Sequence, residues 1–197
     1  MRQSEQNLQQ TLLRSGEAQM IKSQALAVIT QIMMLECNGW VPNNPRLPVL
    51  VYPNAIAEQS SDLAALFEKT FSTNGWPPQW RNGVYSYHHY HTEGHEVLGI
   101  ASGHARLMLG GPNGFVLNVS AGDALLLPAG TGHCNLASSD DFLVVGAYPP
   151  RQQADICREA PSKVQLETID KLPFPSQDPV QGLHGAVSKY WVSHRVQ

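Results

Sequence analysis

The sequence predicts an all-β fold, a sandwich or barrel of short antiparallel strands with one flanking helix. Glycine-containing turns such as Ser102-Gly103 and Pro112-Asn113-Gly114 separate short apolar or alternating runs, and no helical pattern comes between these runs. Short strands at this even spacing are typical of antiparallel β-sandwiches and barrels. The six runs, all between residues 83 and 148, are VYSYHHYH, EVLGI, HARLML, FVLNV, DALLLP and FLVVGAY.

The remaining chain is predicted to flank this core within a single domain, residues 25–197. Residues 1–19 are polar and Gln-rich, and residues 1–24 are predicted to form an N-terminal extension. Residues 25–35 are apolar and fit a helix or a strand equally well. Residues 38–48, dense in Asn, Gly and Pro, indicate an ordered loop, and PVLVY at 48–52 indicates a short buried strand.

One helix is predicted after residue 60, packed on the outside of a sheet. Ser60 or Ser61 can cap it, Asp62 suits its first turn, and Asn74-Gly75 ends it. Its apolar residues recur at helical spacing: Leu63, Leu66, Phe67 and Phe71. Beyond residue 150 the chain is predicted to be an irregular, proline-bearing C-terminal tail.

Composition excludes several classes of protein. The 197 residues are 42% apolar and 15% charged, as in an ordinary globular protein. A net charge of −3 supplies no basic field for nucleic acid, and no apolar run approaches the roughly 20 residues of a membrane helix. The N-terminus lacks the pattern of a secretory signal. The cysteines are odd in number and widely spaced, at Cys37, Cys134 and Cys157, which argues against a disulfide framework. This favours a reducing compartment, so we expect a cytoplasmic protein.

A histidine-rich segment carries the strongest chemical signal. On a strand, residues two apart point the same way, so His89 and His91 share one face and can hold a single ion. Glu96 opens the next predicted strand and can add an oxygen ligand, and His133 follows from a separate turn, PAGTGH. An isolated His-x-His is more often part of a solvated, inert strand than of a metal site, and it is the wider spacing that favours a metal.

That spacing resembles the two conserved motifs of the cupin superfamily. The second motif departs at its end, because Ala137 stands where the family has Asn, and Asn135 is out of register. The first motif is matched at Gly83, His89, His91, Glu96 and Gly103, and the second at Gly122, Pro128, Gly130 and His133.

The flanking segments resemble a narrower group, the small bacterial YjlB-like cupins, through VPNNPRLPVLVYP, HYH…HEVLG and LPAGTGHC. The resemblance implies the cupin fold, a double-stranded β-helix or jelly-roll barrel, and pairing into a homodimer. In cupins the residues at these motif positions bind one metal. The resemblance therefore implies that one divalent transition metal, which can be Fe, Mn, Ni, Co, Cu or Zn, is bound by His89, His91, Glu96 and His133.

Four protein ligands on an octahedral ion leave two positions open, which favours a metal-dependent enzyme acting on a small organic molecule. We expect a dioxygenase, an isomerase or a decarboxylase, with Tyr85 and Tyr87 as candidate catalytic residues and no organic cofactor. The alternatives are a non-catalytic cupin that binds or senses a small ligand, and a structural metal in an interaction protein.

Overall fold

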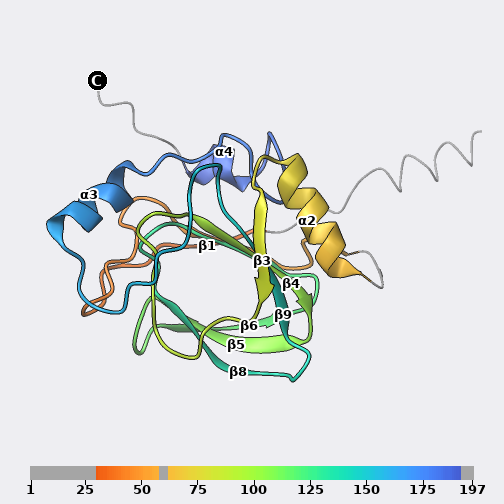
Figure 1. Cartoon of the computed structure of the whole chain (residues 1–197), viewed down its shortest axis with the longest axis horizontal. Coiled ribbons are helices and arrows are strands. Elements are labelled where there is room, and N and C mark those ends of the chain that lie inside the picture. The colour runs from red at the N-terminus through yellow and green to blue at the C-terminus, as the bar shows by residue number, and fades with distance from the viewer. Residues whose placement is uncertain (1–29, 58–61, 192–197) are drawn as a thin grey trace, which may run out of the picture.

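The computed structural model describes residues 30–57 and 62–191, which form two antiparallel sheets packed face to face (Figure 1). The larger sheet has the order β1 (Gln31–Met33), β2 (Val49–Tyr52), β7 (Ala124–Leu127), β4 (Glu96–Ser102), β9 (Leu143–Ala147) and β3 (Pro78–Asn82). The smaller sheet has the order β6 (Phe115–Ser120), β5 (His104–Leu109) and β8 (His133–Ser138). This confirms the predicted all-β fold, a cupin-like jelly roll, although the two sheets stay separate.

Several elements differ from their prediction. Residues 25–35, which fitted helix or strand, contain strand β1, and β3 and β8 were not predicted. The predicted strand VYSYHHYH is not a regular strand: residues 83–95 carry only isolated bridges at His89 and Tyr90. This segment leaves β3, at one edge of the larger sheet, and runs along β8, where the Asn135 N–H donates to the Tyr85 carbonyl at 2.8 Å. A chain that crosses between two sheets cannot keep the pairing of either.

The central strands β2, β7 and β4 of the larger sheet are buried on both faces, which explains their nearly continuous apolar runs. In β4, Leu98 and Ile100 pack between the sheets, whereas Val97 and Ala101 pack into a second apolar layer on the outer face. Because side chains alternate along a strand, Glu96 points between the sheets as Leu98 does. The fold thus aims a carboxylate into the interior.

Helix α2 (Leu63–Thr73) covers the outer face of the larger sheet, as predicted. Its cap is Asp62, whose carboxylate accepts a hydrogen bond from the Ala65 N–H at 3.0 Å. Asp62 is thus the cap itself and not, as predicted, a residue of the first turn. Ser60 and Ser61, the predicted caps, lie outside the described residues. Gly99 lets the helix approach, since a Cβ there would lie 2.6 Å from the Phe67 ring.

The C-terminal tail is mostly irregular, as predicted, and adds two short helices, α3 (Lys163–Lys171) and α4 (Ala186–Tyr190). Trp191 is buried and donates through Nε1 to the Pro48 carbonyl at 2.8 Å, which fixes the tail against β2. None of the described helices is long and apolar enough to cross a membrane. The predicted N-terminal extension, residues 1–24, lies outside the described residues.

Candidate metal centre

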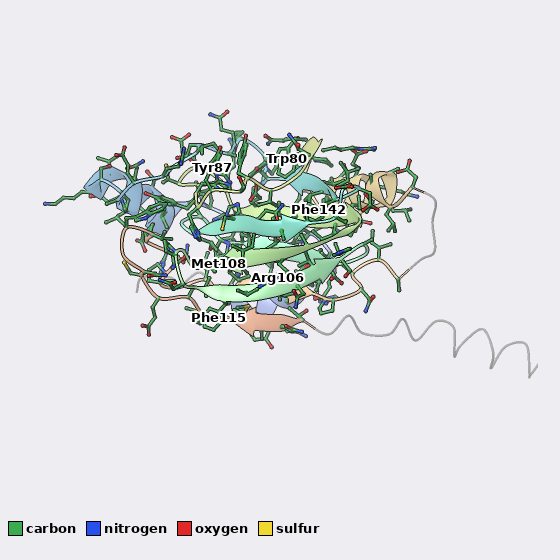
Figure 2. The ribbon with its side chains drawn as sticks, turned by 90° about the horizontal axis from the view of Figure 1, so that it is seen from below. Trp80, Tyr87, Arg106, Met108, Phe115 and Phe142 are labelled. Atoms are coloured by element: carbon green, nitrogen blue, oxygen red, sulfur yellow. The ribbon has the colours of Figure 1, made fainter. Side chains whose placement is uncertain are left out.

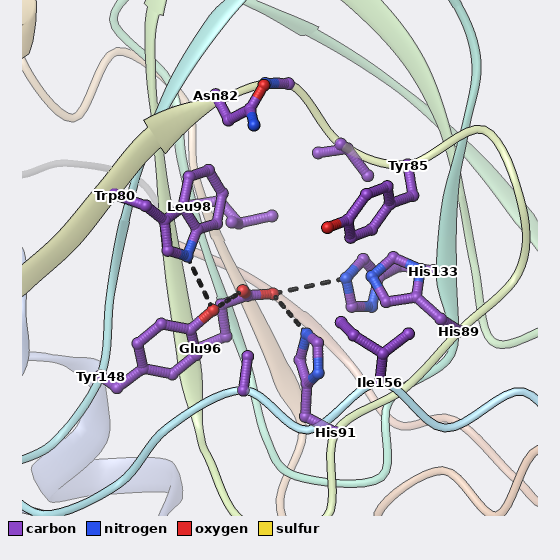
Figure 3. Close-up of a pocket in the computed structure, with 13 residues that line it drawn as sticks. Trp80, Asn82, Tyr85, His89, His91, Glu96, Leu98, His133, Tyr148 and Ile156 are labelled. Carbon is purple, nitrogen blue, oxygen red and sulfur yellow. Dashed lines mark hydrogen bonds and ion pairs between the residues drawn. The ribbon is translucent and has the colours of Figure 1, made fainter.

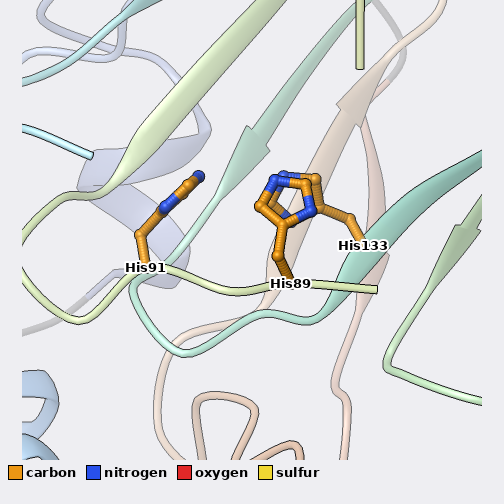
Figure 4. A group of neighbouring side chains, drawn as sticks. All are labelled: His89, His91 and His133. Atoms are coloured by element: carbon orange, nitrogen blue, oxygen red, sulfur yellow. The ribbon is translucent and has the colours of Figure 1, made fainter. Parts of the chain in front are cut away.

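Three histidines meet between the sheets because the irregular segment pairs with strand β8. The His89 N–H donates to the His133 carbonyl at 3.2 Å, and the His133 N–H returns the bond to His89 at 2.9 Å. The ring centroids of His89 and His133 are 4.1 Å apart, and His91 lies beside them (Figure 4). One nitrogen from each of the three rings falls within 4.8 Å of the others.

Each imidazole is held in a single tautomer by the backbone. Nδ1 of His89 faces the Tyr87 carbonyl at 3.1 Å, and Nδ1 of His133 faces the Thr131 carbonyl at 3.0 Å. Nδ1 of His91 is hydrogen bonded to the Asp155 carbonyl. A carbonyl oxygen only accepts, so Nδ1 carries the hydrogen and the Nε2 lone pair of the neutral ring remains free. Metal-binding histidines have this arrangement.

Glu96 completes the set from strand β4. Its Oε2 lies 3.3 Å from His133 Nε2 and 3.5 Å from His91 Nε2, and these contacts are not hydrogen bonds of normal geometry (Figure 3). Oε2 is thus a buried acceptor without a hydrogen-bond donor, which is rare in folded proteins. Three histidine rings that each offer a nitrogen within 4.8 Å of the others, with an unpartnered carboxylate oxygen beside His91 and His133, fit a divalent metal ion.

The other oxygen of Glu96 is held by residues that the sequence did not single out. Oε1 accepts a hydrogen bond from the hydroxyl of Tyr148, which itself accepts one from Trp80 Nε1 at 2.9 Å. Tyr148 follows β9, and the alternation of that strand was a usable signal: Val144 packs between the sheets, and Tyr148, four residues later, points the same way.

Burial and neighbouring charges shift the pKa values of these groups in opposite directions. Burial lowers the pKa of His89 to about 3. Burial also acts to lower the pKa of His91, but the Glu96 carboxylate outweighs it and the pKa is raised. For Glu96, burial acts to raise the pKa, but His91 and His133 hold it well below its usual range. Burial, reinforced by Glu96, raises the pKa of Tyr148 and keeps its hydroxyl protonated.

A cavity of about 330 Å³ adjoins the four predicted ligands. Tyr85 lines this cavity and is 49% exposed, at the mouth. Tyr87 does not line it, because its ring stacks on Tyr85 at 4.8 Å and lies under the Arg158 guanidinium. The remaining lining residues are Trp80, Asn82, Gly83, Val84, Leu98, Tyr148, Ala154 and Ile156.

The C-terminal tail closes one side of the site. Tyr90 and Cys157 form an antiparallel bridge with hydrogen bonds of 3.0 and 2.9 Å. The Asp155 carboxylate accepts from the Thr92 N–H at 2.7 Å, the Thr92 hydroxyl at 2.6 Å and the Glu93 N–H at 3.0 Å. Since the Asp155 carbonyl also holds His91, this tail segment fixes a predicted ligand. No local sequence signal marks this long-range contact.

The Asn-rich loop before β2 positions the turn that carries His133. Asn43 is buried, and its Oδ1 accepts from the Gly132 N–H at 3.0 Å. Asn44, also buried, donates to the Ala129 carbonyl at 3.0 Å. The loop that the sequence predicted to be ordered is therefore a support of the site.

Four other side chains near the site in the sequence lie outside the cavity. Arg106 and Met108 are on the outer face of the smaller sheet (Figure 2). His95 is buried, with Nδ1 accepting from the Ala129 N–H at 3.0 Å and Nε2 donating to the Leu172 carbonyl at 3.2 Å, so both nitrogens are used. Cys134 is buried with Sγ 3.7 Å from His88 Nε2.

No protein-family model matches this sequence. Over 165 residues it is 35% identical to the uncharacterized protein YjlB of Bacillus subtilis (strain 168), an alignment that covers 83% of this chain and 97% of the relative. An identity of this size over nearly the whole relative means that this chain belongs to the YjlB family.

Proposed function

We propose that this protein is a metal-binding cupin in which His89, His91, Glu96 and His133 bind one divalent transition metal, and that it is an enzyme acting on a small organic molecule. The observation that carries the proposal is the cluster of three histidines, each held at Nδ1 by a backbone carbonyl, with the unpartnered Glu96 Oε2 beside two of them, His91 and His133.

The ligand types suit Mn, Fe, Co, Ni, Cu or Zn, since imidazole and carboxylate donors are common to all of them. The cavity next to the ligands favours a site that admits substrate over a closed structural one. When bound, such an ion polarises a substrate oxygen or takes part in dioxygen chemistry.

The chain's own residues have separate tasks in this proposal. Tyr148 holds Glu96 through Oε1 and leaves Oε2 directed at His91 and His133. Tyr85, at the mouth, is the candidate for moving a proton to or from substrate. Tyr87 supports the Tyr85 ring by stacking. Dioxygen-dependent cleavage is the first reaction to test, followed by isomerisation and decarboxylation.

The experiment combines metal analysis with an activity screen. Elemental analysis of protein from its native organism, and calorimetric titration of metal-free protein, should both give one metal per chain. His133→Asn should abolish this binding, whereas His104→Gln, a change at an exposed histidine on β5, should leave it intact. Dioxygen uptake and product formation are then measured with candidate substrates.

The outcomes separate the candidate functions. A protein that binds metal and a small ligand, but converts none of the compounds tested, supports the binding or sensing alternative. Wild-type protein that binds none of the six metals contradicts both.

A further inference from the structure

The residues that line the cavity restrict the charge of the ligand that it can bind. Among the residues that the structure describes, no Lys or Arg lines it. Nearby guanidinium groups are engaged elsewhere: Arg158 lies 4.2 Å from the centroid of the Tyr87 ring, and Arg81 forms a two-bond pair with Glu68 at 2.7 and 2.8 Å. An anionic substituent away from the metal would have no cation to pair with.

The walls are mainly apolar and aromatic. Leu98, Val84 and Ile156 contribute aliphatic surface, and the Trp80 and Tyr85 rings contribute flat faces (Figure 3). The neutral polar groups at the mouth are the Asn82 amide and the Tyr85 hydroxyl, which can hydrogen bond to an uncharged substituent. A volume of about 330 Å³ is near the lower end of ligand pockets, which run from roughly 300 to 1,000 Å³. The cavity therefore suits a small organic molecule.

The net charge of the proposed metal ion and its ligands also disfavours a ligand with more than one negative charge. The three histidines, when neutral, and the Glu96 carboxylate bring one negative charge to a divalent ion, which leaves one positive charge. A ligand with a single negative charge makes the buried site neutral. A dianion leaves a net negative charge beside ligands that are at most 4% exposed, where an unpaired charge is costly.

We propose that the natural ligand of this cavity is a small, largely apolar molecule with at most one negative charge, and that diacids and phosphorylated compounds are excluded. This inference rests on the proposed metal site, because the charge count assumes a divalent ion held by the four ligands.

Two chelating probes test the proposal on Co(II)-loaded protein. Maltol (3-hydroxy-2-methyl-4-pyranone) binds metals through two oxygens as a monoanion with a flat organic body, and oxalate binds through two oxygens as a dianion without one. Binding is followed by the visible absorption of Co(II), and metal retained on a desalting column shows that the probes have not removed it. We expect the Kd for maltol to be at least about tenfold lower than that for oxalate, a difference of about 1.4 kcal/mol.

A matched pair of variants separates the effect of the wall from the inherent preference of cobalt. Ile156 lines the cavity and is 44% exposed, whereas Ile32 lies on edge strand β1 and is 42% exposed. Ile156→Lys adds a cation to the wall and should shift the maltol-to-oxalate ratio toward oxalate by about tenfold or more. Ile32→Lys adds the same charge elsewhere and should leave the ratio unchanged.

Each result has one meaning. Oxalate binding as tightly as maltol to wild-type protein, or an unchanged ratio in Ile156→Lys, overturns the inference. So does a Co(II)-loaded protein that binds neither probe. Failure of cobalt itself to bind is seen before any probe is added, and it contradicts the proposed function.

Discussion

Removal of the Tyr148 hydroxyl tests whether residues behind the ligands control metal binding. In Tyr148→Phe the ring remains, but Glu96 Oε1 loses its hydrogen-bond donor and Trp80 Nε1 loses its acceptor. Both Glu96 and Tyr148 are almost fully buried, so water does not readily replace the lost bonds. The Glu96 carboxylate is then free to turn, and it takes up a proton more easily, which the metal must displace.

The size of the effect follows from the kind of bond that is lost. Replacing a hydrogen-bond partner behind a metal ligand typically weakens metal affinity by about 10- to 100-fold. This corresponds to about 1.4–2.7 kcal/mol of binding free energy. A hydrogen bond to a buried carboxylate contributes about 1.5–3 kcal/mol to folding, so the free energy of unfolding should fall by a similar amount.

The chain offers a matched control on the far side of the larger sheet. The Tyr52 hydroxyl is buried and donates to the Asp178 carboxylate at 2.7 Å, outside the cavity. Tyr52→Phe should also lower the free energy of unfolding in urea, because it too removes a buried hydroxyl–carboxylate bond. Calorimetric titration with cobalt should nevertheless give the wild-type Kd.

Two results would refute this reasoning. A Tyr148→Phe protein that binds cobalt as tightly as wild type shows that the hydroxyl does not orient Glu96. Equal losses of affinity in Tyr148→Phe and Tyr52→Phe show that the effect comes from general destabilisation.

Three further predictions concern pH, metal removal and packing. Because the pKa of His91 is raised, a proton on His91 competes with the metal at pH values below that pKa, and the Kd for metal should increase about tenfold for each unit by which the pH falls. His89 has a pKa of about 3, so a proton on His89 should compete only at far lower pH. Calorimetry in a pH series checks this, and a Kd independent of pH between about pH 5 and pH 7 contradicts it. Chelation of the metal should lower thermal stability, since a metal present at 100 times its Kd adds about 2.7 kcal/mol, and an unchanged melting temperature argues against a bound ion. Gly99→Ala should cost about 1–3 kcal/mol in urea unfolding, because its Cβ would lie 2.6 Å from the Phe67 ring, whereas Gly83→Ala meets nothing within 4 Å and should cost less.

The sequence predicted the fold well where strands are buried and short. Strands β2, β5, β7 and β9 and helix α2 fall within the segments predicted for them, and β4 and β6 begin where predicted but end two residues and one residue later. Strands β3 and β8 were missed because PQWRN and HCNLAS carry neither a continuous apolar run nor a clear alternation. Their pairing partners, β9 and β5, are provided by distant parts of the chain.

The candidate site was predicted from the spacing of the motifs and from the alternation of side chains along a strand. Alternation correctly placed His89 and His91 together, even though residues 83–95 do not form a regular strand, and the motif spacing correctly placed Glu96 beside His91. Tyr85 and Tyr87, also two residues apart, were both candidate catalytic residues, but only Tyr85 lines the cavity. In an irregular segment, side-chain alternation holds locally and fails over a longer stretch.

Residue type, spacing and side-chain alternation are local properties of a chain, and they were enough to identify the residues of the candidate metal site and to place them among short antiparallel strands. Only the tertiary structure decided what stands behind and around them. Tyr148 reaches Glu96 across 52 positions, and the Asp155 carbonyl reaches His91 across 64. Contacts over such separations depend on how the sheets and the tail pack: alternation along β9 indicates which way Tyr148 points, but not that Glu96 is its partner.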